Sequence, residues 1–311
     1  MTEETSTAGR GAPPGRFLRL AALASLLGSG WLALTKGVAL RALLWDAAAF
    51  GFFPRVLGLG WNEWVTSAAV DRWISHAEKM IGVAFVLLAT LLFWWSRGGP
   101  RRAFGQAPAT PSQPSPRGRA TQNKRSLFLI PFLLFPLLRT FLFWKEHFWQ
   151  AGALLELGVQ TLAPLLFIMH QWRKPAEERL WRAVSTVLAV TFIGHGLYAI
   201  GLHPVPAHFV FMTQSGLGFG EDAARQLLFT VGVLDFLAAG LLLLPLRKAW
   251  LAALAWVIPW AILTTLARLW SYGGFVGVDT LLSQWLPEVV VRLPHVFLPV
   301  ALLCRLGWDE G

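Results

Sequence analysis

Apolar runs of about 20 residues, separated by short basic clusters, recur along almost the whole chain. A run of that length spans the hydrocarbon core of a bilayer as an α-helix, because backbone groups in lipid must find their hydrogen bonds within the segment. Hydrophobic residues make up 55% of the chain and charged residues 14%, whereas soluble domains carry about a quarter charged residues. The pattern therefore predicts an all-α, polytopic membrane protein surrounded by the lipid bilayer.

Eight apolar segments are long enough to be transmembrane helices. The first follows Arg16 and Arg19 and resembles a signal peptide, but it can span the bilayer and lacks a small-residue cleavage site, so we interpret it as a retained helix. The expected helices are residues 17–35, 77–96, 126–144, 152–171, 182–202, 226–245, 249–271 and 286–305.

The positions of the basic residues predict the orientation of these helices. The net charge of +10 comes from Lys and Arg clusters between apolar segments, so it indicates topology and not nucleic-acid binding. Residues 97–125 are rich in Pro, Gly and Ser, basic, and free of acidic residues, as in a flexible cytoplasmic linker. Both termini are therefore predicted to be cytoplasmic, in an inner (plasma) membrane. The Trp- and Gly-rich outer connections predict short interfacial or re-entrant helices at 37–76, 203–225 and 272–285.

Four sequence matches in the same order indicate an internal duplication. Each half is expected to contain a helix, a long outer segment and three further helices, which makes the two repeats parallel. The domain division that follows is a disordered tail at 1–15, a first repeat at 16–172 that includes the linker 97–125, and a second repeat at 173–311. The matched segments are 28–34 with 194–200, 58–64 with 216–222, 81–93 with 231–244, and 155–167 with 287–299.

The second half has a glycine-bearing first helix, an outer loop, and the sequence GVLDFLAAGLLLL beginning at Gly232. In these features it resembles the DoxX-like family of four-helix bacterial membrane proteins, with Asp235 where that family commonly has Glu or Asp. The first half resembles the family only through the duplication, because Phe85 replaces the acidic residue. The resemblance implies a four-helix fold for each repeat and an association with quinol or thiol redox systems.

Six Asp, Glu, Arg or His residues fall within the predicted helices of the second half, away from their cytoplasmic ends. Such groups are costly in a bilayer and usually face a partner or a cavity. Three of them are spaced i, i+4 and i+7, which places them on one face of the last helix. The depth of each residue can be estimated from the helical rise. By this estimate the polar groups of four helices all lie in the outer half of the membrane. The candidate ligand-binding residues are His195, Asp235, Arg268, Glu288, Arg292 and His295.

Three interpretations of this polar set remain open. It could hold a small amphipathic ligand, it could be structural, with Asp235 paired to Arg268 or Arg292, or it could form a proton path. Pro294 is expected to leave the carbonyl near Val290 free for a side chain or ligand.

No cofactor or metal is assigned. His195 and His295 could ligate a haem between helices, but no haem motif accompanies them, and a quinone fits the setting better. Cys304 is the single cysteine, which excludes a Cys-based zinc site. His203 and His208 are interpreted as parts of a proline-stiffened turn.

The sequence therefore predicts a redox-associated membrane subunit that binds a quinone- or lipid-like ligand in the second repeat. Asp235 and Arg292 would supply charge, and His195 and His295 hydrogen bonds or proton exchange. The alternatives are a small-solute or proton transporter and a structural subunit of a membrane complex without a ligand. No catalytic residue is identified, so enzymatic activity stays open.

Overall fold

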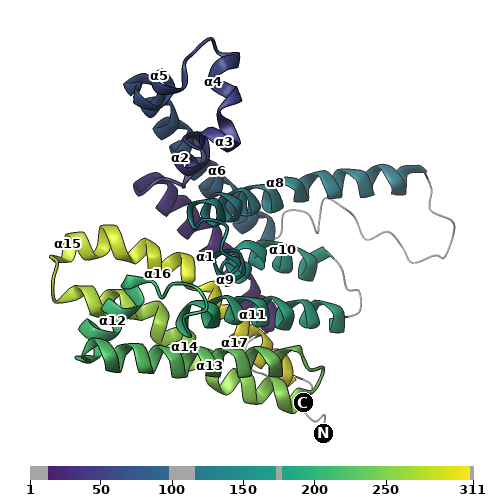
Figure 1. Ribbon diagram of the computed structural model, residues 1–311. Coiled ribbons are helices and arrows are strands. Elements are labelled where there is room, and N and C mark those ends of the chain that lie inside the picture. Colours follow the sequence, from purple (N-terminus) through teal and green to yellow (C-terminus); the bar gives the residue numbers. More distant parts are fainter. Residues whose placement is uncertain (1–12, 98–115, 173–176, 309–311) are drawn as a thin grey trace, which may run out of the picture. The chain divides into compact units, whose positions relative to one another are not determined.

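The computed structural model is helical throughout its regular structure (Figure 1). It describes residues 13–97, 116–172 and 177–308, of which 116–129, 172 and 308 are described by their backbone alone. The expected tail and linker therefore lie largely outside the described residues, although α8 begins at Pro116, inside the segment expected to be a linker.

Seven helices within the described residues are long and apolar enough to cross a membrane, so the chain is an all-α, polytopic membrane protein, as predicted. The eighth expected segment, 126–144, lies within α8 (Pro116–Glu146) and is not among these seven. The seven spans are Pro14–Thr35, Ala68–Ser96, Ala151–Gln171, Glu177–Ala199, Glu221–Leu243, Arg247–Gly273 and Val278–Gly307.

The chain divides into two compact units. Unit 1 comprises residues 1–25 and 150–311, and unit 2 comprises Leu26–Trp149. Helix α1 (Pro14–Thr35) contributes its first part to unit 1 and the remainder to unit 2. The repeats expected from the sequence remain a prediction, and their boundary at residue 172 does not coincide with the boundary between the units.

Unit 1 is built around α11, which packs against α13, α9 and α10, while α14 packs against α13, α12 and α17 (Figure 1). Fully buried side chains such as Leu188, Phe192, Val257 and Leu298 form its core. Its elements after α1 are α9 (Ala151–Glu156), α10 (Gly158–Trp172), α11 (Glu177–Ala199), α12 (Ala207–Leu217), α13 (Glu221–Leu243), α14 (Arg247–Gly273), α15 (Val278–Thr280), the π-helix η1 (Leu281–Trp285), α16 (Leu286–Arg292) and α17 (Pro294–Trp308).

Glycines let α11 approach its neighbours closely. A Cβ on Gly196 would lie 3.2 Å from the carbonyl oxygen of Gly232 on α13, and a Cβ on Gly194 would collide with the backbone of Leu155 and Glu156. The two glycines flanking His195 thus permit close helix approach on both sides of α11. One consequence is that the α9–α10 junction lies directly against α11 beside His195.

Unit 2 combines long helices with four short ones. The long helices α1 and α6 cross at Gly30 and Gly82, where a Cβ on either glycine would lie 3.1 Å from the other's carbonyl oxygen. Short helices fill residues 40–66 of the expected outer segment 37–76, whereas residues 68–76 already belong to α6. In the later connections α12, α15 and η1 are short as expected, and residues 221–225 already belong to α13. The elements of unit 2 after α1 are α2 (Leu40–Leu44), α3 (Ala47–Phe50), α4 (Phe52–Val56), α5 (Trp61–Thr66), α6 (Ala68–Ser96) and α8.

Candidate functional site

Ionisable side chains from five elements of unit 1 meet in one group. They come from the α9–α10 junction, α11, α14, α16 and α17, so residues far apart in the sequence become neighbours. Five of the six residues expected from the sequence belong to this group, and one residue joins it that the sequence did not single out. We call the group the polar cluster, and its members are Glu156, His195, Arg268, Glu288, Arg292 and His295.

Glu288, Arg292 and His295 lie on one face of the last membrane span, as predicted. The Glu288 carboxylate forms an ion pair with Arg292 one turn later, and the Arg292 guanidinium also donates to the Glu288 carbonyl at 3.3 Å. The Nδ1 of His295 lies 3.0 Å from the Arg292 carbonyl, a geometry in which the ring donates its Nδ1–H. Helical periodicity alone brings these three together.

The imidazoles of His195 and His295 stack face to face. Their ring centroids are 5.3 Å apart and their planes differ by 14°. His195 is half-buried and His295 is only 4% exposed. The backbone of Glu156 lies within hydrogen-bonding range of the His295 ring, so the α9–α10 junction closes the pair on another side.

Arg268 connects α14 to this group. Its Nε lies 3.9 Å from the Glu288 carboxylate, and its side chain is 7% exposed. Its guanidinium donates to the Thr264 carbonyl at 3.2 Å, and the charges of Arg292 and Glu156 also act on it. Two arginines and two glutamates thus share the cluster, which formally carries no net charge.

Both tyrosines of the chain border the polar cluster, although the chain has 17 tryptophans and only 2 tyrosines. Tyr198 is 3% exposed, and the Glu156 carboxylate acts on it. The backbone of Ala153 approaches its hydroxyl, but no described residue meets the geometry of a full hydrogen bond to it. Tyr272 stacks on Trp285 with centroids 3.6 Å apart and lies within electrostatic range of Arg268 and Glu288. The site therefore contains phenol groups in addition to imidazole, guanidinium and carboxylate.

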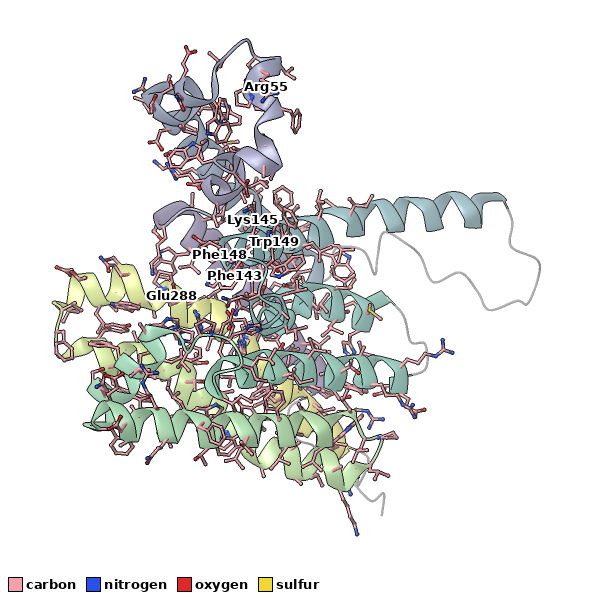
Figure 2. The ribbon with its side chains drawn as sticks, viewed as in Figure 1. Arg55, Phe143, Lys145, Phe148, Trp149 and Glu288 are labelled. Carbon is pink, nitrogen blue, oxygen red and sulfur yellow. The ribbon has the colours of Figure 1, made fainter. Side chains whose placement is uncertain are left out.

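The cluster is buried on one side and accessible on the other. The side chains of Glu288 and Arg292 are 21% and 26% exposed, whereas Arg268 and His295 are buried. Figure 2 labels Glu288 on its helix, with the sticks of many side chains gathered beneath it. Glu288 and Arg292 are therefore the members of the cluster that a small polar headgroup would meet first.

Asp235 does not belong to the cluster. Its carboxylate accepts a hydrogen bond from the Trp256 Nε1–H at 2.9 Å, and among the described residues it forms no ion pair with Arg268 or Arg292. The carboxylate that pairs with both arginines is Glu288. The proposed Asp235–arginine pair is therefore wrong, because α13 presents Asp235 toward α14 at the level of Trp256.

A second expectation also needs correction. Pro294 was expected to leave the carbonyl near Val290 free, but the Leu293 N–H donates to the Val290 carbonyl at 3.2 Å. The helix is interrupted at Leu293, where α16 ends and α17 begins, and the tightened turn satisfies the carbonyl.

The geometry does not fit a haem between the two histidines. A ligating imidazole uses a nitrogen lone pair that lies in its ring plane, so two axial ligands point edge-on at the iron from opposite sides. The rings of His195 and His295 instead lie face to face with no room for a macrocycle. Nor do the described residues contain a group of three His, Cys, Asp or Glu side chains that could hold a metal ion, and His203 Nε2 already accepts the Gly152 N–H at 3.2 Å.

Sequence reasoning missed Glu156, Tyr198 and Tyr272 as members or neighbours of the site. Two signals could have found them: Glu156 aligns with Glu288 in the proposed duplication, and tyrosine is rare in this Trp-rich chain. Neither signal shows which helices are neighbours.

Unit 2 contains a separate ionic network. Arg41 on α2 binds three side chains on one face of α6, namely Asp71, Ser75 and Glu78, at 2.7 to 3.0 Å. Glu78 is 5% exposed. All three partners are hydrogen-bonded to the one guanidinium, so the network holds the short helix against the long one.

The fold and the site define the class of the protein: an integral, polytopic α-helical membrane protein with a buried polar cluster in one helical unit. Comparisons with known proteins found no match, since no family model, curated protein or solved structure is similar to this chain.

Proposed function

We propose that this membrane protein binds a quinone, or a closely similar amphipathic molecule with a carbonyl or hydroxyl headgroup, at the polar cluster of unit 1. The observation that carries the proposal is the convergence of a stacked histidine pair, a charge-balanced Arg–Glu set and both tyrosines on one partly accessible spot. A DoxX-like, redox-associated membrane subunit, the reading that the sequence supports, agrees with such a ligand.

The charge balance supports a neutral headgroup over an anionic one. Glu156 and Glu288 would repel a phosphate or carboxylate that approached Arg268 and Arg292. A quinone carbonyl carries no net charge and accepts hydrogen bonds from guanidinium, imidazole or phenol groups. Its apolar tail can remain in lipid while the headgroup contacts Arg292.

The hydroxyl of Tyr198 supports the same assignment, because the approach of the Ala153 backbone does not give it a full hydrogen bond. A buried polar atom without a partner costs about 1–3 kcal/mol, and native structures usually satisfy such atoms with water or a ligand. Tyr198 is adjacent to Glu156 in the cluster. Imidazole, phenol and carboxylate groups side by side can also pass the protons that accompany reduction of a quinone.

The rival assignment is a structural role, and one observation favours it: Glu288 already pairs with Arg292 and approaches Arg268, so the cluster stabilises its own charges. In that case the cluster would hold α14, α16 and α17 together and bind nothing.

The experiment is mass spectrometry of small molecules that co-purify with the detergent-solubilised protein, run on the wild type, His295→Ala, Arg292→Gln and the control Asp235→Asn. The control changes a buried polar group outside the cluster and keeps an oxygen that can accept from Trp256. We expect quinone in the wild type and the control and its loss from the two cluster variants. Thermal unfolding with added short-chain benzoquinone provides the second readout. An empty wild type that benzoquinone does not stabilise would overturn the proposal in favour of the structural role.

A further inference from the structure

The end of unit 1 opposite the polar cluster brings together the ends of four helices. We call it the basic end and define it by Arg19 on α1, His170 on α10, Trp181 on α11 and Arg305 on α17. Trp181 precedes His195 by 14 residues on α11, which separates the two regions by about 21 Å along the helix. Nothing at this end takes part in the proposed quinone site.

Contacts between the helices establish that these ends meet. A Cβ on Gly15 of α1 would overlap the ring of His170. That ring lies 6.4 Å from the ring of Trp181. Arg305 Nε forms an ion pair with Glu177 on the first turn of α11 at 2.9 Å.

Two buried donors at this end have no acceptor. Trp181 is 2% exposed, and its Nε1–H has no hydrogen-bond partner among the described residues. The Nε–H of Arg19 is also buried, and no described residue accepts a hydrogen bond from it. Native proteins rarely leave such groups unpaired, so an acceptor beyond the described residues is expected to satisfy them.

Helix geometry directs both donors to the same place. Arg19 follows Gly15 by one turn, so the two residues lie on the same face of α1 about 6 Å apart. Side chains of an α-helix lean toward its N-terminus. The guanidinium of Arg19 therefore extends back toward the Gly15–His170 contact, where the Trp181 ring also lies.

The charges at this end favour an anionic acceptor. The two acidic residues on the first turn of α11 both have cationic partners: Glu177 pairs with Arg305, and Glu178 with Arg182. The described part of α1 contains no acidic residue. Among the residues that the structure describes, the basic end has cationic donors in excess of carboxylates, unlike the polar cluster.

We propose that the basic end is a phosphate-binding site for the headgroup of an anionic phospholipid, with Arg19 and Trp181 as donors. Four of the candidate spans begin or end at this level, at Pro14, Gln171, Glu177 and Gly307, which is where the phosphates of a bilayer lie. Guanidinium groups bind phosphate oxygens with charge-assisted hydrogen bonds. The acyl chains would lie against the apolar faces of the same helices.

Native mass spectrometry of the full-length protein in detergent, titrated with phosphatidylglycerol or with phosphatidylcholine of the same acyl chains, tests the proposal. We expect phosphatidylglycerol to bind about tenfold more tightly than phosphatidylcholine, and Arg19→Gln and Trp181→Phe each to remove most of that preference. The Trp181→Phe variant keeps an aromatic ring and loses only the N–H. Arg55→Gln, which changes an exposed arginine in unit 2, serves as the matched control and should bind as the wild type does.

A second arm separates the two sources of phosphate. If millimolar inorganic phosphate displaces the lipid from the wild type but not from either variant, the phosphate group itself is recognised. If inorganic phosphate stabilises the protein while neither lipid binds selectively, the lipid assignment is overturned and the site is one for free phosphate. Equal lipid binding by the wild type and both variants would overturn the site altogether, and thermal unfolding of each variant shows that it is folded.

Discussion

At the scale of single residues, the guanidinium of Arg41 binds several side chains of α6 at once. Its Nε and one terminal nitrogen both donate to Asp71, and its other terminal nitrogen donates to Glu78 at 2.9 Å. Glu78 lies within a candidate membrane span and is almost fully buried, so its charge depends on this partner. The arginine is itself a third exposed, which weakens each interaction through solvent screening.

We therefore expect Arg41→Met to lower the free energy of unfolding by about 1–3 kcal/mol, mostly because Glu78 loses its cation. Arg41→Lys should cost less, because it keeps the charge but cannot bind two carboxylates with a planar fork. Chemical unfolding in detergent measures the difference. Arg55→Met is the control, because Arg55 is exposed on α4 (Figure 2). If Arg41→Met costs no more than the control, the network is not stabilising.

Asp46 provides a prediction on pH dependence. Its carboxylate accepts a hydrogen bond from Lys145, and then from the backbone of Ala49 and Ala48 at the start of α3, which lowers its pKa below the ordinary 3.8. A lowered carboxyl pKa stabilises the fold above the ordinary value, and the stabilisation disappears as the pH falls through the folded-state pKa. Lys145 also lies 5.4 Å from the centroid of the Trp149 ring, and Figure 2 shows the two side chains together.

We expect the wild type to lose stability more steeply than Asp46→Asn between about pH 5 and pH 2.5. The asparagine can still cap α3 but cannot titrate. Thermal unfolding followed across this pH range makes the comparison, and parallel curves for the two proteins would contradict the assignment.

At the scale of elements, the same type of crossing occurs in both units. Gly30 and Gly82 bring α1 against α6, and Gly196 and Gly232 bring α11 against α13. In the proposed duplication Gly30 aligns with Gly196 and Gly82 with Gly232. The repeated crossing supports the proposal that the two halves descend from one four-helix unit.

Two glycines of α13, Gly232 and Gly240, differ in the space available for a side chain. A Cβ on Gly232 would lie 2.5 Å from Ile200 Cγ2 and 3.0 Å from the Ile200 backbone nitrogen, whereas Gly240 has nothing within 4 Å. Gly232→Ala should therefore lower the free energy of unfolding by about 1–3 kcal/mol through overpacking. Gly240→Ala should be neutral or stabilising, because alanine favours the helix by about 1 kcal/mol. Chemical unfolding of both variants in detergent tests this. Equal changes in the free energy of unfolding would contradict the close approach of α11 and α13 at Gly232.

At the scale of the whole molecule, the expected topology can be tested with single cysteines. In a Cys304→Ser background, Arg55→Cys should react with a membrane-impermeant maleimide in intact cells, since α4 belongs to an expected outer segment. Lys248→Cys, in the first turn of α14, should react only after the membrane is permeabilised. Both positions are exposed, so burial does not prevent labelling. The reverse pattern would invert the proposed orientation.

The sequence by itself determined the class of the protein and several local features. Seven of the eight expected segments appear as span-length helices, because the length of an apolar run is a property of the run alone. The common face of Glu288, Arg292 and His295 was predictable for a similar reason, since helical periodicity largely persists along this one span despite the interruption at Leu293.

Only the tertiary structure decided which polar groups meet. Depth along a helix can be estimated from residue number, but the direction in which a side chain points depends on how that helix rotates and packs against its neighbours. For that reason Asp235, placed at the right depth, lies with Trp256 and not with the arginines. For the same reason Glu156, which comes from another segment, joins the site: Gly194 lets the α9–α10 junction lie against α11, next to Tyr198.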